Sequence, residues 1–240
     1  MVMGTSYNPR IVTDGLVLCL DAGNRRSFTS GDSEWKDLSK SALAGTLFNS
    51  PTFDENNGGG LIFDGTNDYI QMPSTTKLNM AQYGSVSISM FCKSNHTSST
   101  GWNTYWAGVS KYNHFILGSN GFGGKMAFLV FTGGSWRPTN YTADIWGQSN
   151  IDIREYHLYT GTYNGNTGVS SLYVDDSLEY SAVVGSQHSF SNHTSAFEIG
   201  KRDISNHFLN ANINIVSIYG KALTADEVRQ NYLATKERYA

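Results

Sequence analysis

The stretch LIFDGTNDYI, Leu61–Ile70, shows in short form the pattern that recurs along this chain. The apolar runs Leu61–Phe63 and Tyr69–Met72 flank the polar segment Asp64–Asn67. Asp, Gly and Asn dominate tight turns, because Gly tolerates the required backbone angles and the Asp and Asn side chains bond their own backbone. The stretch therefore predicts two short β-strands joined by a turn.

Runs of the same kind recur along the chain and are separated by turn clusters. In SVSISMFC, Ser85–Cys92, apolar side chains alternate with serines, so that Val, Ile, Met and Cys share one face of a strand. No long helical segment separates the runs, which predicts an antiparallel sandwich rather than βαβ units. The other runs are Gly15–Leu20, Met126–Phe131, Tyr156–Tyr163, Ser171–Val174, Phe197–Ile199 and Ile213–Tyr219.

Size and composition indicate one large domain with few charges. The chain has 240 residues, and its charged fraction of 15% is well below the roughly 25% of an average soluble domain. Lys and Arg (17) do not outnumber Asp and Glu (20), which argues against nucleic-acid binding, since that depends on basic side chains at phosphates. No apolar run is long enough for membrane insertion. We also expect no signal peptide, because the N-terminus lacks a basic start followed by an apolar run.

The two cysteines, Cys19 and Cys92, both lie in apolar, strand-like runs. This placement is typical of buried free thiols, and it argues against a disulfide framework.

One helix is predicted at the C-terminus. Thr224–Glu227 (TADE) has the form of a capping box, in which the Thr hydroxyl and the Glu carboxylate each accept a backbone N–H. Leu223 and Val228 on either side can form a hydrophobic staple. We expect a structural helix over residues 224–239 that completes a single domain, residues 15–240. Residues 1–14 are expected to form an extended arm.

Several segments, taken in order, resemble the concanavalin A-like lectin/glucanase superfamily in its laminin-G-like branch. Leu61–Ile70 is similar to the branch's FDG-x-x-DY motif, and Ala211–Leu223 to its closing strand, GxIDEVRIYNRAL. The further matches are Tyr163–Gly165 with Ser171–Asp175 (TYDG…LYVNG) and Phe197–Gly200. The resemblance implies an all-β jelly-roll sandwich of two antiparallel sheets with a short C-terminal α-helix.

The chain departs from that pattern in its closing strand. Asn214 and Ile215 stand where the branch has an acidic pair, and Ala211 stands where it has Gly. A calcium site built on the acidic pair is therefore not carried over to this chain.

The opening segments, Asn8–Asn24 and Trp35–Ser39, resemble the N-terminus of laminin-G-like structural proteins of tailed bacteriophages. This resemblance implies a virion protein, a capsid decoration or a tail or fibre component, assembled in the cytoplasm of a bacterial host. Its expected partners are other virion proteins. The resemblance leaves open host-surface glycans and further copies of the chain as additional partners.

An enzymatic alternative rests on one hexapeptide. Asn150–Glu155 (NIDIRE) fits the E-[IL]-D-[IF]-x-E pattern of retaining β-glucanases except at its first position. There Asn150 replaces the nucleophilic glutamate and cannot form a glycosyl ester, so we expect a chance match on a β-strand and no enzymatic activity.

A carbohydrate-binding module is the main alternative to the virion role. Aromatic faces stack on sugar rings, and the candidates are Trp102, Tyr105, Trp136 and Tyr141, of which Trp102 and Trp136 lie in loop-like contexts. The same residue types also build β-sandwich cores and protein interfaces.

No cofactor is required by any motif, but Ca²⁺ is open. Asp64, Asn67 and Asp68 place three oxygen-bearing side chains within five residues, and Ca²⁺ prefers oxygen ligands. The competing interpretation is that these side chains hold their own turn. The six histidines are scattered and lack zinc-site spacing.

Overall fold

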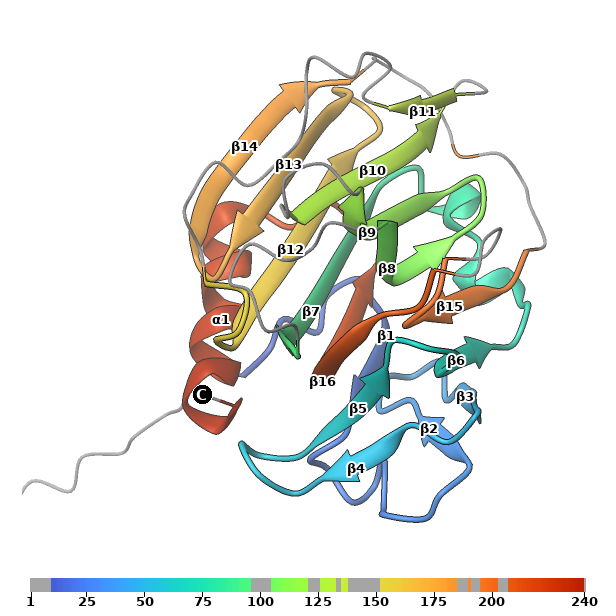
Figure 1. Cartoon of the computed structure of the whole chain (residues 1–240). Coiled ribbons are helices and arrows are strands. Elements are labelled where there is room, and N and C mark those ends of the chain that lie inside the picture. Colours follow the sequence, from blue (N-terminus) through green and yellow to red (C-terminus); the bar gives the residue numbers. More distant parts are fainter. Residues whose placement is uncertain are drawn as a thin grey trace, which may run out of the picture.

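In a computed structural model, the chain forms two antiparallel β-sheets that pack face to face, with one α-helix against the outside of one sheet (Figure 1). The structure describes residues 10–95, 105–120, 126–132, 135–137, 152–184, 190, 195–202 and 207–239. The predicted sandwich with a C-terminal helix is confirmed.

The first sheet, called sheet A here, is built around the long strand β16. Its order is β14 (Ser177–Val183), β13 (Val169–Val174), β12 (His157–Asn164), β7 (Val86–Ser94), β16 (Asn210–Tyr219), β5 (Gly60–Asp64) and β4 (Thr52–Asp54). Strand β1 (Leu16–Asp21) pairs with the second half of β16, while β5 pairs with its first half.

The second sheet, sheet B, faces it across the core. Its order is β11 (Ser135–Arg137), β10 (Met126–Thr132), β9 (Phe115–Asn120), β8 (Tyr105–Lys111), β15 (Phe197–Ile199), β6 (Tyr69–Met72), β3 (Ala44–Phe48) and β2 (Glu34–Lys36). Two 3₁₀ turns, η1 (Thr76–Leu78) and η2 (Met80–Gln82), follow β6.

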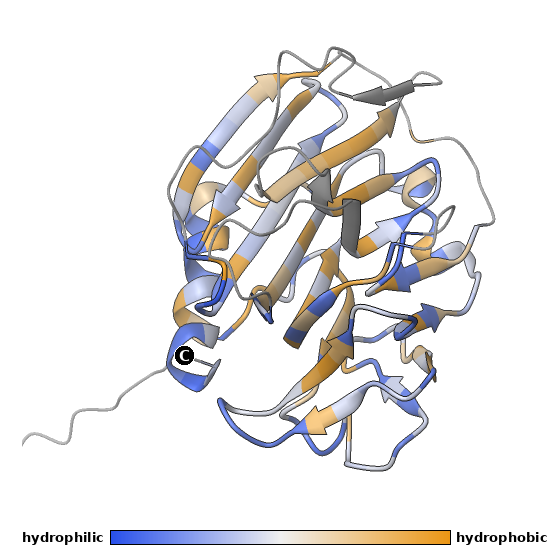
Figure 2. Ribbon diagram, viewed as in Figure 1, coloured by the Kyte–Doolittle hydropathy of each residue, from blue (hydrophilic) through white to orange (hydrophobic). Residues whose placement is uncertain are grey.

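The core lies between the sheets and has the predicted alternation. On β7, Val86, Ile88, Met90 and Cys92 are all fully buried in the main apolar cluster. Figure 2 shows apolar residues gathered on strands such as β5 and β10, whereas the loop between β4 and β5 is hydrophilic. Both predicted buried thiols, Cys19 and Cys92, are confirmed as buried and free.

The opposite face of β7 is also buried, although Ser87 and Ser89 on it are polar. The hydroxyl of Ser87 donates to the carbonyl of Lys221 (2.9 Å) and accepts the N–H of Leu223 (2.8 Å). Ser89 shares a 2.9 Å hydrogen bond with Thr160 on β12. Small hydroxyl side chains thus satisfy one another where the C-terminal segment covers sheet A.

The covering element is helix α1 (Ala225–Tyr239), which begins with the predicted capping box. Thr224 Oγ1 accepts the Glu227 N–H (3.3 Å), and a Glu227 carboxylate oxygen accepts the Thr224 N–H (3.0 Å). Leu223 and Val228 pack together with Tyr173 and Tyr219, which project from the outer face of sheet A. At the other end of the helix, Tyr239 packs against Phe91 with ring centroids 5.5 Å apart.

Residues 10–14 lie along the same helix. The backbone N–H of Val12 donates to the Asn231 side chain (2.8 Å), and the Gln230 amide donates to the carbonyl of Arg10 (2.7 Å). Residues 1–9 of the expected arm lie outside the described part of the chain.

The last turn of α1 is fixed to sheet A through a buried carboxylate. Asp21, at the end of β1, accepts two hydrogen bonds from Arg238 (2.7 and 3.1 Å) and one from the Tyr239 hydroxyl (2.7 Å). The Asp21 side chain is only 7% exposed, so its charge depends on these donors. The contact therefore holds the end of the helix at the edge of β1.

We predict that Asp21→Ala lowers the free energy of unfolding by about 2 kcal/mol, mainly because it leaves the buried Tyr239 hydroxyl without its acceptor, whereas the half-exposed Arg238 guanidinium can be hydrated. Urea unfolding followed by circular dichroism measures the change. Glu237→Ala on the exposed side of the same turn is the control and should stay within about 0.5 kcal/mol of wild type. Equal effects of the two substitutions would contradict the assigned role of Asp21.

Candidate functional site

The larger of two surface hollows lies beside β2, β3 and β4, and we call it the corner groove. Its walls are the segment before β2 and the connection from β3 to β4, and its volume is about 540 Å³. This volume is in the range of small-molecule sites. The lining residues are Phe28, Ser30, Gly31, Asp32, Ser33, Leu47, Asn49, Ser50, Pro51, Thr52 and Phe53.

The groove has an apolar floor and a polar rim. Phe28 is buried, and its ring lies 5.6 Å from the half-buried ring of Phe53. Most of the remaining lining side chains carry hydroxyl, amide or carboxylate groups, and most of these are exposed. An apolar surface with a few convergent polar groups is the usual composition of a ligand site.

Two rim residues have a backbone conformation that L-amino acids disfavour. The φ angles of Asn49 and Ser50 are +62° and +74°, and the left-handed region costs a non-glycine residue about 1–2 kcal/mol. The Asn49 amide nitrogen donates to the carbonyl of Asn67 (2.7 Å), which holds the turn in place. Strain of this kind is found disproportionately at ligand sites, where it positions side chains.

Asp32 is the one charged residue among the described lining residues. Its Oδ2 accepts the N–H of Thr29 (3.1 Å) and lies 3.5 Å from the Lys36 ammonium. Its Oδ1 makes no hydrogen bond to the described part of the chain, and the side chain is about one-third exposed (32%). The groove therefore offers a carboxylate oxygen to a ligand.

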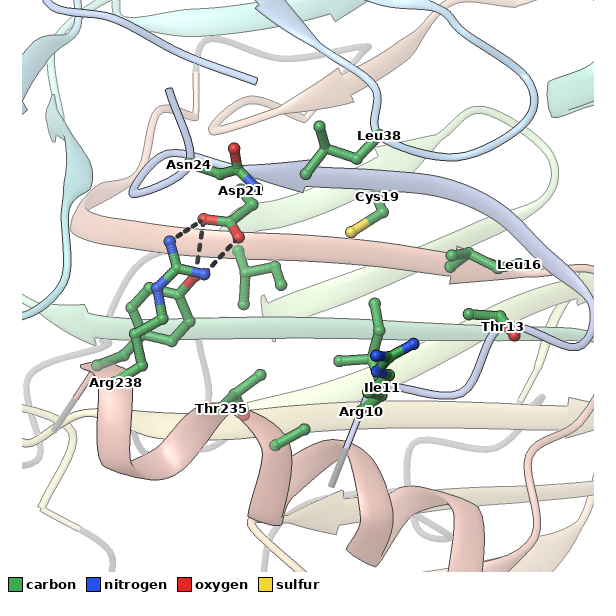
Figure 3. A pocket seen from close by; sticks show the side chains of 13 residues that line it. Arg10, Ile11, Thr13, Leu16, Cys19, Asp21, Asn24, Leu38, Thr235 and Arg238 are labelled. Carbon is green, nitrogen blue, oxygen red and sulfur yellow. Dashed lines mark hydrogen bonds and ion pairs between the residues drawn. The ribbon is translucent and has the colours of Figure 1, made fainter. Parts of the chain in front are cut away.

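The second hollow, the helix cleft, separates α1 from β1 and has a volume of about 380 Å³ (Figure 3). Arg10 and Ile11 lie along one side, and the Asp21–Arg238 pair closes one end. The sulfur of Cys19 points into the cleft. Burial raises the pKa of this thiol to about 12, so it stays protonated and unreactive at neutral pH. We interpret the cleft as a packing gap under the helix.

We predict that neither thiol of the native protein reacts with a disulfide reagent such as DTNB at pH 8, because both are buried and protonated. Absorbance of the released thiolate, or the mass of the product, counts the modified residues. Two thiols should react once the chain is unfolded in guanidinium. Rapid labelling of Cys19 in the native state would show that the helix cleft opens.

The predicted glycan-binding aromatics fall largely outside what the structure describes. Trp102 and Tyr141 lie outside the described residues. Tyr105 begins β8 and Trp136 lies in β11, both in sheet B, so the loop-like context expected for Trp136 was wrong. The side chains of both residues are outside the described part. Glycan binding through these four residues stays a prediction.

The predicted calcium ligands lie close together and serve the turn that they form. Asp64 Oδ1 accepts the N–H groups of Thr66 (2.7 Å) and Asn67 (3.2 Å), and Asp68 Oδ2 accepts the N–H of Asp64 (3.1 Å). Partial burial by itself would raise the pKa of Asp64, but these backbone donors outweigh it and lower the pKa. Burial raises the pKa of Asp68. Among the described residues, no group of three or more His, Cys, Asp or Glu side chains is placed to hold a metal ion.

Calcium binding at this turn stays an open alternative to the turn interpretation, and a melting experiment separates the two. Because the carboxylates already accept backbone N–H groups, we expect millimolar CaCl₂ and EDTA to give the same melting temperature by differential scanning fluorimetry. A calcium-dependent rise that Asp64→Asn abolishes would instead establish a metal site.

In the described part of the hydrolase-like hexapeptide, Asp152–Glu155, the expected β-strand is wrong. Asp152–Glu155 form a turn that leads into β12, while Asn150 and Ile151 lie outside the described residues. Arg154 donates from Nε to Asp152 Oδ1 (2.8 Å), and this side-chain contact, with the Arg154 backbone N–H, lowers the pKa of Asp152 to about 2. A short turn replaces the extended strand because Asp152 bonds the backbone two residues on.

A sequence profile of the concanavalin A-like lectin/glucanase superfamily matches residues 64–229. The chain belongs to this superfamily. Curated protein sequences gave no match. In the described part of the chain, we find no helix with the length and apolar character needed to cross a membrane.

Solved structures with the same fold include domains described as binding domains. One solved structure with this fold is domain 4 of AbnA, a GH43 extracellular arabinanase from Geobacillus stearothermophilus, in complex with arabinotriose. It matches this chain with a TM-score of 0.67 at 16% identity, and the match covers 93% of this chain and 100% of that domain. The binding domain of Paraclostridial Mosquitocidal Protein 1 has a TM-score of 0.67 at 13% identity, over 91% of this chain and 52% of that one. The receptor-binding domain of botulinum neurotoxin C/D mosaic serotype has a TM-score of 0.68 at 14% identity, over 92% of this chain and 51% of that one. This chain thus spans about half the length of the two toxin domains.

Proposed function

We propose that this chain is a non-catalytic carbohydrate-binding module that holds a glycan in the corner groove. The groove itself carries the proposal, because its apolar floor and its rim of hydroxyl, amide and carboxylate groups match the two surfaces of a sugar ring. The strained backbone at Asn49 and Ser50 gives independent support, since it holds two polar side chains at the rim.

The solved relatives support a binding role over a catalytic one. One is described in complex with arabinotriose, and two are described as binding or receptor-binding domains of toxins. At 13–16% identity these likenesses establish the fold alone, so the ligand of this chain has to be found by experiment.

A glycan array with the purified chain, followed by calorimetry that includes arabinotriose, tests the proposal. We predict that Asn49→Gly weakens binding of the strongest array ligand about three- to tenfold, the effect of one lost hydrogen bond. Glycine adopts the left-handed backbone angles at no steric cost, but the substitution also removes the tether to Asn67, so its effect is read together with that of Ser50→Gly, which keeps the tether. Asn113→Gly at another left-handed asparagine, between β8 and β9, is the matched control and should leave affinity unchanged.

Ser50→Gly separates binding from stability. Relief of backbone strain offsets the extra freedom of the unfolded chain, so the free energy of unfolding should stay within about 1 kcal/mol of wild type while affinity falls. If both glycine variants bind normally and Trp102→Ala or Trp136→Ala abolishes binding, the glycan site is the predicted loop aromatics and not the corner groove.

The virion role implied by the opening segments remains a separate proposal. A glycan-binding module on a capsid or tail would combine both roles, with other virion proteins as attachment partners. Mass spectrometry of purified phage particles tests it, and consistent absence of the protein from the particles would contradict it.

A further inference from the structure

The polar groups fixed in the corner groove are hydrogen-bond acceptors. Because the Asn49 amide nitrogen donates to the Asn67 carbonyl, the amide oxygen is the atom left for a ligand, and it has no partner among the described residues. Asp32 presents its Oδ1 in the same way. The remaining polar side chains of the rim are hydroxyls (Ser30, Ser33, Ser50 and Thr52), which rotate and serve either as donor or as acceptor.

The charge of the groove has one sign. The described lining includes no Lys, Arg or His side chain, and Lys36, which is not part of the lining, lies 3.5 Å from Asp32 Oδ2. Lys36 is about half exposed (53%), so water screens much of its charge. An acidic ligand in the groove would therefore meet the Asp32 carboxylate, whose charge is offset only in part by the half-exposed Lys36.

We propose that the corner groove selects glycans that carry hydrogen-bond donors and no negative charge, and that it favours sugars with a protonated amino group over their neutral counterparts. This inference rests on the proposed function and adds the chemical class of the ligand. An ammonium group near Asp32 Oδ1 gains an ion pair, neutral hydroxyls gain ordinary hydrogen bonds, and uronic acids or sulfated sugars are repelled.

Three tetrasaccharides that differ in charge test the inference by calorimetry on the full chain. They are chitotetraose (neutral), its fully de-N-acetylated form at a pH where the amines are protonated (cationic), and tetragalacturonate (anionic). The attraction between opposite unit charges about 4 Å apart in water raises an association constant about fivefold. We expect the cationic form to bind about fivefold more tightly than the neutral one, and the anionic form to bind weakest.

Asp32→Asn should abolish the preference for the cationic form while keeping the shape of the groove. Asp176→Asn is the matched control, because it makes the same change in net charge at an exposed turn between β13 and β14, far from Asp32 in the sequence. This variant should keep the preference for the cationic form. The three sugars also differ in their acetyl groups, so the order of affinities of the wild-type chain is not sufficient. The outcome is decided by comparing that order between Asp32→Asn and Asp176→Asn.

The outcomes separate the inference from the proposed function. If a sugar binds in the groove but Asp32→Asn leaves the order unchanged, or if tetragalacturonate binds as well as chitotetraose, the charge preference is wrong and the glycan site stands. If none of the three tetrasaccharides binds, the ligands found on the glycan array test the inference instead. Acidic array ligands would contradict the charge preference, and neutral or amino sugars would support it. An array with no ligand at all contradicts both.

Discussion

The buried carboxylate of Asp21 joins parts of the chain that are far apart in sequence. It ends β1, receives Arg238 and Tyr239 from the last turn of α1, and lies two residues from Gly23. At Gly23 the backbone touches the loop after β4 so closely that a Cβ atom would lie 1.7 Å from the carbonyl oxygen of Gly58. The carboxylate is buried while the Arg238 side chain is 42% exposed, so the ion pair itself adds little net stability, and the contact acts mainly to fix one arrangement.

The same corner positions the groove in which we place the ligand. The N–H of Asp21 donates to Ser27 Oγ (3.1 Å), and the N–H of Lys36 donates to the carbonyl of Ser27 (2.8 Å). The wall between these anchor points, residues 28–35, is therefore held at both ends. The opposite wall is held through Asn49 and the turn before β6. A site whose walls are fixed before binding loses less conformational entropy when the ligand arrives.

The interior strands could be predicted from the sequence, and the site could not. Strands such as β7 and β16 bury one alternating apolar face, which the residue pattern records directly. Ser87 and Ser89 form a polar face that would suit solvent, yet α1 and its connection bury it, and only tertiary packing decides that outcome. Strands β2 to β4 are short, three to five residues each, and lack a clear alternation. The groove that they flank combines two separate segments whose lining includes neither Trp nor Tyr, so exposed large aromatics do not mark it in the sequence. The Asn49–Pro51 sequence is the one turn signal that indicates it.

The proposed glycan site lies between residues 28–33 and 47–53, and backbone NMR tests that placement most directly. With the strongest ligand of a glycan array added to the ¹⁵N-labelled chain, the amide signals of these two segments should shift in proportion to saturation, while those of the helix cleft, such as Cys19 and Ile215, stay unchanged. Shifts confined to β8–β11 or to the helix cleft, with none at the corner groove, would contradict the account.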